Sequence, residues 1–299
     1  MTEPGAFHSA WITSDGQVSG EGAFTEIFPW WSFTKTALAV AVLKLVEKGA
    51  LQLDAPLPDK PYTLRQLLLH VAGVPDYGAL AGYHEAVAKG EGAWPRERLL
   101  REAQAERLAF SPGTDFLYSN IGYMFVGDII ASATGLSVAA ALEALVTAPL
   151  SLASVSFATK RADLARTFWP ALRLYDPAWV YHGLLVGSPV DAARLLSAVL
   201  TGNFLERTSV AAMFNRQIKL SGPGTSGLPR TERGYALGLM LGREEPAGRV
   251  AGHSGGGPVG SSAVYHYPDL PRPVTVATFT LIDPPAGENE ARRIALACQ

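Results

Sequence analysis

The sequence predicts an α+β protein with two lobes, in which one antiparallel β-sheet, flanked by helices, is built from both ends of the chain. Residues 10–28 alternate around a Ser-Asp-Gly turn, as β-hairpins do. Residues 234–283 contain four short apolar segments bounded by Gly, Pro or Asp, which indicates strands. Helical patterns fill most of the chain between them. We therefore expect residues 1–50 and 205–299 to form the sheet domain, and residues 51–204 to form an all-helical insert.

The first predicted helix runs from Ser32 to Lys48. Apolar residues cover nearly its whole circumference, and Gly49 follows as a left-handed stop. A helix that is apolar on most sides is buried in the protein. The sequence therefore predicts a central helix here, in which Lys35 is an unusual residue.

Further helices are indicated by helical periodicity and by capping residues at their ends. They are expected at residues 63–73, 95–106, 121–135, 188–202 and 288–298. The helix at 188–202 has Ser188 as its N-cap and Pro189 at its first position. The strands are expected at residues 234–242, 249–256, 260–268 and 273–283.

The composition narrows the classes of function. The chain has 299 residues, 48% of them hydrophobic, and a formal net charge of −2 without a long basic run. A nucleic-acid partner is therefore not expected. The single cysteine, Cys298, cannot form an internal disulfide or a cysteine-based metal cluster. No secretory signal and no bilayer-spanning apolar run are visible, so we expect a cytoplasmic protein without a membrane partner.

Ser32 and Lys35 lie three residues apart at the start of the predicted central helix. Positions i and i+3 share a helix face, so the two side chains can meet. A serine hydroxyl needs a base to become a strong nucleophile, and a lysine in an apolar pocket has a lowered pKa and can be that base. Ser-x-x-Lys is also a loose pattern, in which the serine often caps a helix and the lysine reaches solvent.

Two further segments carry polar side chains that are suited to catalysis. Tyr118 and Asn120 follow a Pro-Gly turn; a tyrosine beside a lysine can pass protons, and an asparagine amide can bind a carbonyl group. His253 and Ser254 precede a glycine cluster in an expected strand, where glycines permit close approach of a ligand. The structural alternatives are a core tyrosine with an asparagine turn, and a flexible glycine hairpin.

Together these three segments resemble the penicillin-recognising serine hydrolases, in particular the branch that is similar to class C β-lactamases. That branch includes D-alanyl-D-alanine carboxypeptidases, D-amino-acid peptidases and amidases, and esterases. The stretches LRQLLLHVAGVPDY, FSPGTDFLYSNIGYMFVGDIIASATGLSV and HGLLVGSPVDAARLL are also similar to segments of this family. The resemblance implies a β-lactamase/transpeptidase-like fold, with the active site in the cleft between the two lobes.

The resemblance also implies a role for each candidate residue. Ser32 is the acylated nucleophile, Lys35 accepts its proton, and Tyr118 acts as acid or base in both half-reactions. The backbone N–H groups of Ser32 and Gly256 form the oxyanion hole. The substrate-binding residues that it implies are Asn120, His253, Ser254 and Gly255. It implies no cofactor and no metal.

The sequence departs from the family pattern at position 253, where the family has the lysine of a Lys-Thr-Gly motif. His253 is mostly neutral at pH 7 and lacks the permanent charge that engages a substrate carboxylate. We therefore expect a serine hydrolase that cleaves small-molecule esters, amides or lactams, with an esterase, amidase or peptidase favoured over a true β-lactamase.

Three alternatives remain open on the sequence alone. The first is a penicillin-binding module with little turnover. The second is an acyltransferase that passes the same acyl group to an alcohol or amine. The third is a structural two-lobed protein in which the three segments lie apart. The physiological substrate and the oligomeric state are not predicted.

Overall fold

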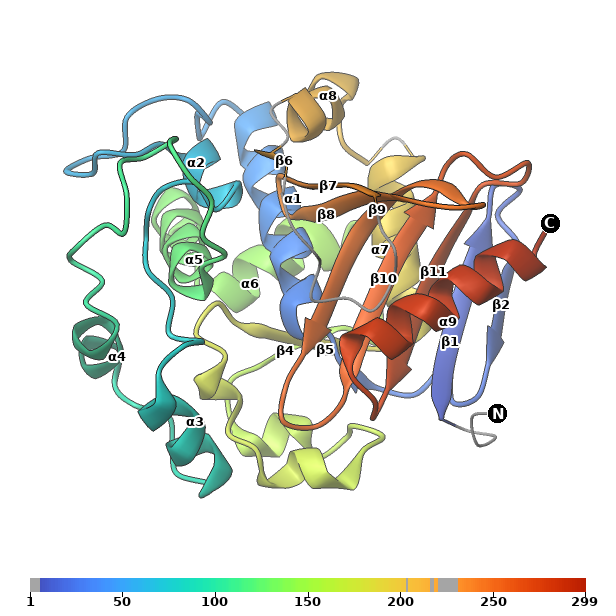
Figure 1. The fold of residues 1–299 in the computed structure, drawn as a ribbon, viewed down its shortest axis with the longest axis horizontal. Helices are drawn as coiled ribbons and strands as arrows, with labels where there is room; N and C mark the ends of the chain where they lie inside the picture. The colour runs from blue at the N-terminus through green and yellow to red at the C-terminus, as the bar shows by residue number, and fades with distance from the viewer. Residues whose placement is uncertain (1–5, 203, 216–217, 220–230) are drawn as a thin grey trace.

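The main feature of the computed structural model is an eight-stranded antiparallel sheet, in the order β2-β1-β11-β10-β9-β8-β7-β6 (Figure 1). The structure describes residues 6–202, 204–215, 218–219 and 231–299. The strands are β1 (Phe7–Thr13), β2 (Val18–Glu21), β6 (Ile218–Lys219), β7 (Thr231–Ala236), β8 (Leu239–Glu244), β9 (Gly248–Gly256), β10 (Ser261–Tyr267) and β11 (Val274–Thr280). Because β1 pairs with β11, the sheet joins the start and the end of the chain, which confirms the predicted α+β class.

The helices lie at and between the positions that the sequence indicates. They are α1 (Thr34–Glu47), α2 (Leu64–Leu68), α3 (Ala81–Ala88), α4 (Arg96–Glu102), α5 (Asn120–Thr134), α6 (Val138–Leu142), α7 (Pro189–Leu200), α8 (Arg207–Asn215) and α9 (Pro284–Ala297). Shorter helical turns are η1 (Trp31–Phe33), η2 (Glu143–Thr147), η3 (Arg161–Leu164), η4 (Pro170–Leu174) and η5 (Pro177–Trp179). The helices α3, α6 and α8 were not predicted.

The sheet is covered on both faces. Helix α9 packs on β10 and β11 from one side, and α7 packs on β1, β10 and β11 from the other (Figure 1). Side chains alternate across the sheet, so that Ala263 and Tyr265 of β10 belong to the core under α9, whereas Val264 belongs to the larger core. The central helix α1 contacts α5 and α6 and is almost entirely buried, as the sequence predicts.

Two details of the sequence-based expectation are wrong. The middle segment is not all-helical, because β4 (Ser156–Ala158) and β5 (Leu184–Gly187) form a three-stranded sheet with β3 (Phe28–Pro29). Such short apolar runs show no periodicity that separates strand from helix. In addition, the strand expected at 234–242 is a hairpin of β7 and β8. Gly238 at its turn has φ +70°, and a Cβ there would lie 2.6 Å from the Cβ of Ala39 in α1.

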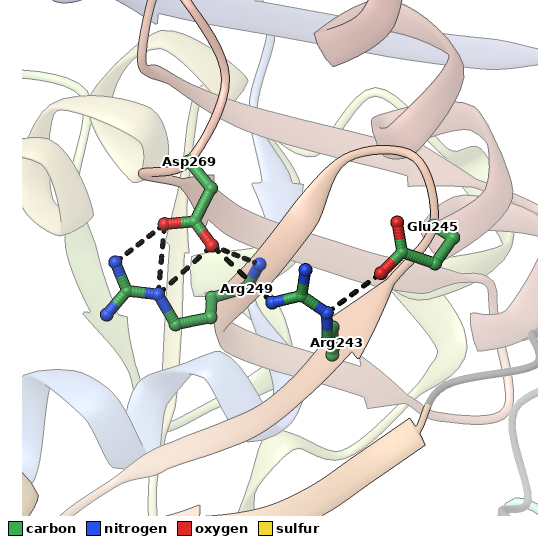
Figure 2. A network of polar contacts seen from close by, with 4 residues as sticks. All are labelled: Arg243, Glu245, Arg249 and Asp269. Atoms are coloured by element: carbon green, nitrogen blue, oxygen red, sulfur yellow. Dashed lines mark hydrogen bonds and ion pairs between the residues drawn. The ribbon is translucent and has the colours of Figure 1, made fainter.

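A polar network connects the end of β8, the start of β9 and the loop that holds Asp269. The Arg249 guanidinium binds Asp269 through Nε at 2.9 Å and Nη2 at 2.6 Å, and the Arg249 backbone N–H donates to the same carboxylate at 2.8 Å. Arg243 of β8 bridges Asp269 and Glu245, as Figure 2 shows. The network joins β8, β9 and the loop between β10 and β11 at the surface.

No single helix of the described residues is long and apolar enough to cross a membrane. The bent pair of α5 with α6 and η2 meets that test only when both parts are counted together, by length and composition.

Candidate active site

Ser32 lies in the tight turn η1, directly before the central helix α1. Trp31 before it has φ +46°, a backbone region that aromatic residues rarely adopt and that surrounding contacts must enforce. The Trp30 N–H donates to the Leu185 carbonyl of β5 at 2.8 Å, and the Ser262 hydroxyl of β10 donates to the Trp30 carbonyl at 2.9 Å. Contacts from both sheets therefore hold the turn that presents Ser32.

The strand β9 runs directly against this turn. A Cβ added at Gly255 would lie 2.5 Å from the Ser32 backbone nitrogen, so only glycine fits there. Strand β8 pairs with β9 only as far as Gly252, and beyond that point β9 contacts η1 on this side. The glycine cluster that the sequence marks as a place of close approach thus meets the backbone of Ser32, with Gly256 next along the strand.

The Lys35 ammonium group is completely buried and has three polar neighbours. Its Nζ lies 3.1 Å from Ser32 Oγ, 2.7 Å from Asn120 Oδ1 and 3.2 Å from His182 Nε2. Burial lowers the pKa of Lys35 from 10.5 to about 7, and the negative charge of Asp76 opposes part of this shift. A substantial fraction of Lys35 is therefore a free amine at neutral pH, with its nitrogen at the Ser32 hydroxyl.

Asn120 begins helix α5, and Asp76 fixes its orientation. One carboxylate oxygen of Asp76 accepts from the Asn120 backbone N–H at 2.7 Å, and the other accepts from the side-chain amide at 3.2 Å. The amide oxygen of Asn120 consequently faces Lys35. The sequence resemblance implies that Asn120 binds substrate; the structure adds this contact with the lysine.

Tyr118 lies over the same lysine, with the Lys35 Nζ 4.9 Å from the centre of its ring. Burial raises the pKa of the Tyr118 phenol well above its usual value, and the nearby Ser32 hydroxyl opposes part of that shift. Among the described residues, the Tyr118 hydroxyl has no hydrogen-bond partner of ordinary geometry. Because its pKa is raised, the Tyr118 phenol keeps its proton at neutral pH. The His70 ring packs at a tilt against this ring, with centroids 4.3 Å apart, and its Nδ1 accepts from the Ser119 N–H at 3.0 Å.

His253 and Ser254 point to opposite faces of β9, as neighbouring strand residues do. His253 is buried on the side of Tyr118, where Nε2 lies 3.0 Å from the Tyr235 hydroxyl and Nδ1 donates to the Ser254 carbonyl at 2.6 Å. Burial and the charge of Lys35 lower the pKa of His253 to about 3, so the ring is neutral. The Ser254 hydroxyl donates to Glu288 of α9 and lies 2.6 Å from the Tyr265 hydroxyl.

Hollows open on two sides of Ser32. A cavity of about 640 Å³ is lined by Ser32, Tyr118, Gly255 and Gly256, and also by Ser254, Arg233 and Glu288. A smaller hollow of about 180 Å³ is lined by Ser32, Asn120, His182 and the aromatic residues Trp31, Tyr77 and Tyr83. It continues past Gly256 and Gly257 into a surface groove of about 770 Å³ with Val87, Leu281 and Ile282 in its wall. Ser32 thus lies between two separate spaces.

Sequence reasoning did not select two residues of this site, Asp76 and His182. Both lie in loops, where periodicity does not show which side chains face inward. Both nevertheless lie in stretches that resemble the family, VPDY and HGLLVG. The resemblance could therefore have indicated these two residues.

A sequence model of the family described as Beta-lactamase matches residues 4–299 of this chain. The D-alanyl-D-alanine-carboxypeptidase/endopeptidase AmpH of Escherichia coli (strain K12) is 25% identical over 259 residues, which cover 76% of this chain and 64% of that protein. Esterase EstB of Burkholderia gladioli is 32% identical over 153 residues, or 44% of this chain and 38% of the esterase. The chain thus spans less than two thirds of these curated relatives.

The solved structure of D-amino acid amidase from Ochrobactrum anthropi SV3 superposes with a TM-score of 0.81 at 21% identity, covering 98% of this chain and 95% of the amidase. At this level of identity the likeness shows the fold, which is the predicted β-lactamase/transpeptidase-like one.

Proposed function

Because the chain belongs to the Beta-lactamase family, we propose that it is a serine hydrolase that forms a covalent acyl-enzyme on Ser32. The observation that carries this proposal is the buried Lys35 amine, 3.1 Å from the Ser32 hydroxyl and with a pKa of about 7. A base of this pKa is well matched to general-base catalysis at neutral pH. The substrate is a small-molecule ester, amide or lactam.

Each half-reaction uses the same groups. Lys35 Nζ takes the proton of Ser32 Oγ while Oγ attacks the substrate carbonyl carbon, and the N–H groups of Ser32 and Gly256 bind the oxyanion. As the bond to the leaving group breaks, the leaving oxygen or nitrogen takes the phenol proton of Tyr118, which is replaced from Lys35. A water molecule then attacks the acyl carbonyl carbon and passes a proton through the Tyr118 hydroxyl to the Lys35 amine. The bond from that carbon to Ser32 Oγ breaks, Oγ takes a proton back from Lys35, and the carboxylic acid is released. Because burial raises its pKa, the Tyr118 phenol holds a proton at neutral pH, as its role as the acid requires.

The two hollows support a substrate with an apolar acyl group and a neutral leaving group. The acyl side, between Asn120 and the aromatic residues, leads to the groove at Leu281 and Ile282. His253 is neutral, fully buried and engaged at both ring nitrogens, and it is not among the residues that line the larger cavity, so it offers no charge to a substrate carboxylate. An esterase or amidase is therefore favoured over a β-lactamase.

The test compares wild type with Ser32→Ala on p-nitrophenyl esters of graded chain length, D-amino-acid amides and nitrocefin. We expect ester or amide turnover that exceeds nitrocefin turnover, and labelling of Ser32 by a fluorophosphonate. Labelling without turnover supports a penicillin-binding module instead. A product that forms only with an added alcohol or amine supports an acyltransferase. No labelling of Ser32 contradicts the proposal.

The proposal also includes the division into lobes and the cellular location that the sequence predicts. We propose that residues 1–50 with 205–299, and residues 51–204, form the two lobes that border the cleft; limited proteolysis with mapping of the resistant fragments tests this division. We also propose that the protein acts in the cytoplasm, which cell fractionation tests.

A further inference from the structure

We propose that His182 is a positioning residue for Lys35, whose unprotonated Nε2 accepts one lysine N–H and thereby directs the amine lone pair to Ser32. This inference rests on the proposed function, because it concerns the base of that reaction. His182 lies in the loop before β5, and its buried ring lines the small hollow beside Ser32. Its Nε2 is 3.2 Å from Lys35 Nζ.

The geometry around the lysine nitrogen gives His182 this role. A neutral amine has two N–H bonds and one lone pair, and Lys35 has three polar neighbours. If Asn120 and His182 each accept one N–H, the lone pair is left for the hydroxyl proton of Ser32. After proton transfer, the ammonium has three N–H bonds, and the same three neighbours accept them. His182 thus serves both protonation states without moving.

Only one tautomer of His182 permits this arrangement. With its proton on Nδ1, the ring presents a lone pair at Nε2 to the lysine. With its proton on Nε2, it donates to the lysine lone pair and blocks the base. The Asn120 amide offers no such ambiguity, because Asp76 holds its N–H₂ group and turns its oxygen to Lys35. The choice of tautomer at His182 therefore decides whether Lys35 is available.

The surroundings keep the ring neutral and in place. Burial, the charge of Lys35 and then His253 lower the pKa of His182 well below its usual value, and the Trp31 backbone opposes part of this shift. Other titratable groups near the lysine and this ring are Asp76, His70, Tyr118, Tyr123 and His253. The hollow that His182 lines is also bordered by Tyr77, Tyr83, His84 and Tyr175. Gly183 follows with φ +93°, and a Cβ there would lie 2.3 Å from the Phe157 ring, so the loop conformation that presents His182 requires glycine.

The first experiment compares His182→Leu with His182→Gln by kcat/KM against pH for the best ester substrate. Leucine keeps most of the volume and removes the acceptor, so we expect a loss of about 10- to 100-fold. The acidic limb also moves to lower pH, because a lost acceptor disfavours the ammonium more than the amine. Glutamine supplies an amide oxygen, and most of the activity returns. A merely structural role changes the melting temperature or the plateau without moving the limb.

His266→Leu is the matched control. His266 is a buried histidine of β10 that bonds Thr275 at 2.9 Å, outside the cleft. Its loss should leave the position of the acidic limb unchanged. Equal profiles for wild type and His182→Leu overturn the proposal while leaving the hydrolase function intact.

The second experiment does not depend on turnover. Nitrogen NMR of histidine-labelled wild-type protein reports which ring nitrogen of His182 carries hydrogen. We expect hydrogen on Nδ1, and a shift of the Nε2 resonance in Lys35→Met. Hydrogen on Nε2 overturns the proposal. If wild type neither labels at Ser32 nor turns over any substrate, the proposed function fails, and the NMR result still decides whether His182 holds the lysine.

Discussion

The Asp76 carboxylate holds Asn120 at two points, its backbone N–H at 2.7 Å and its side-chain amide at 3.2 Å. The second contact turns the amide oxygen toward Lys35 Nζ, which is 2.7 Å away. The same carboxylate raises the pKa of Lys35 by its charge, against the larger effect of burial. One loop residue thus both orients a neighbour of the proposed base and adjusts the pH at which that base is free.

Replacing Asp76 by asparagine should therefore shift the pH dependence. Without the negative charge, the pKa of Lys35 falls below about 7, and more of the amine is free in mild acid. We expect the acidic limb of kcat/KM to move to lower pH, while the plateau falls because the Asn120 amide loses its fixed orientation. A pH profile of ester hydrolysis measures both effects. A limb that stays in place or moves to higher pH contradicts the electrostatic role of Asp76.

Lys35→Met should abolish acylation and change how stability depends on pH. The folded protein lowers the pKa of Lys35 from 10.5 to about 7, so between these values the unfolded chain holds a proton that the folded chain has released. The free energy of unfolding of wild type therefore rises with pH across this window, and below it the destabilisation is complete and constant. The total is on the order of a few kcal/mol. Urea unfolding of both proteins at several pH values tests this; parallel curves would rule it out.

Gly255→Ala should weaken catalysis more than folding. The new methyl group would lie 2.5 Å from the Ser32 backbone nitrogen and 2.7 Å from Trp31 Cβ, so β9 or the turn η1 must shift. A displacement of this kind is expected to lower kcat/KM by about 100-fold. Gly92→Ala is the control, since its nearest new neighbour is Asp176 Oδ2 at 3.9 Å. Similar kcat/KM values for the two variants would show that the close approach at Gly255 is unimportant.

Asp269→Asn should affect stability slightly and acylation not at all. Its bonds to Arg249 lower the pKa of Asp269 from 3.8 to about 2 (Figure 2). A carboxyl with a lowered folded-state pKa stabilises the protein above its unfolded pKa, and this contribution is lost as pH falls toward the folded value. Because the pair is largely solvent-exposed, we expect a loss below about 1 kcal/mol at neutral pH. Thermal unfolding at neutral pH and at about pH 2 should differ between the proteins only at neutral pH. A change in Ser32 labelling would link this network to the site.

The sequence predicts contacts between residues that are close along the chain better than it predicts contacts between distant segments. Ser32 and Lys35 lie one turn apart in sequence, so their proximity follows from helix geometry, and the polar atoms are 3.1 Å apart. The contact of Lys35 with Asn120 joins distant segments, and no periodicity indicates it. His182 is beyond such reasoning as well, because its role depends on which way a loop side chain points.

The fold class follows from the order of elements, whereas single turns do not. Strand patterns near both ends of the sequence predict one sheet that contains strands from both ends, and β1 does pair with β11. The hairpin at Gly238 is missed because GYALGLMLG has no polar turn residue, and its turn packs on α1 in place of solvent. Polar turn residues therefore indicate a hairpin only when its turn is exposed to solvent.

The pairing of β1 with β11 also sets an order of events during translation. Ser32 and Lys35 leave the ribosome more than 200 residues before β9, the strand that lies against Ser32, and before β11, the partner of β1. A nascent polypeptide therefore carries Ser32 long before the backbone that lies against it exists. If Ser32 is the proposed nucleophile, the protein is inactive until β9 and β11 have been synthesised, and a chain that terminates before them carries the serine without its surrounding site.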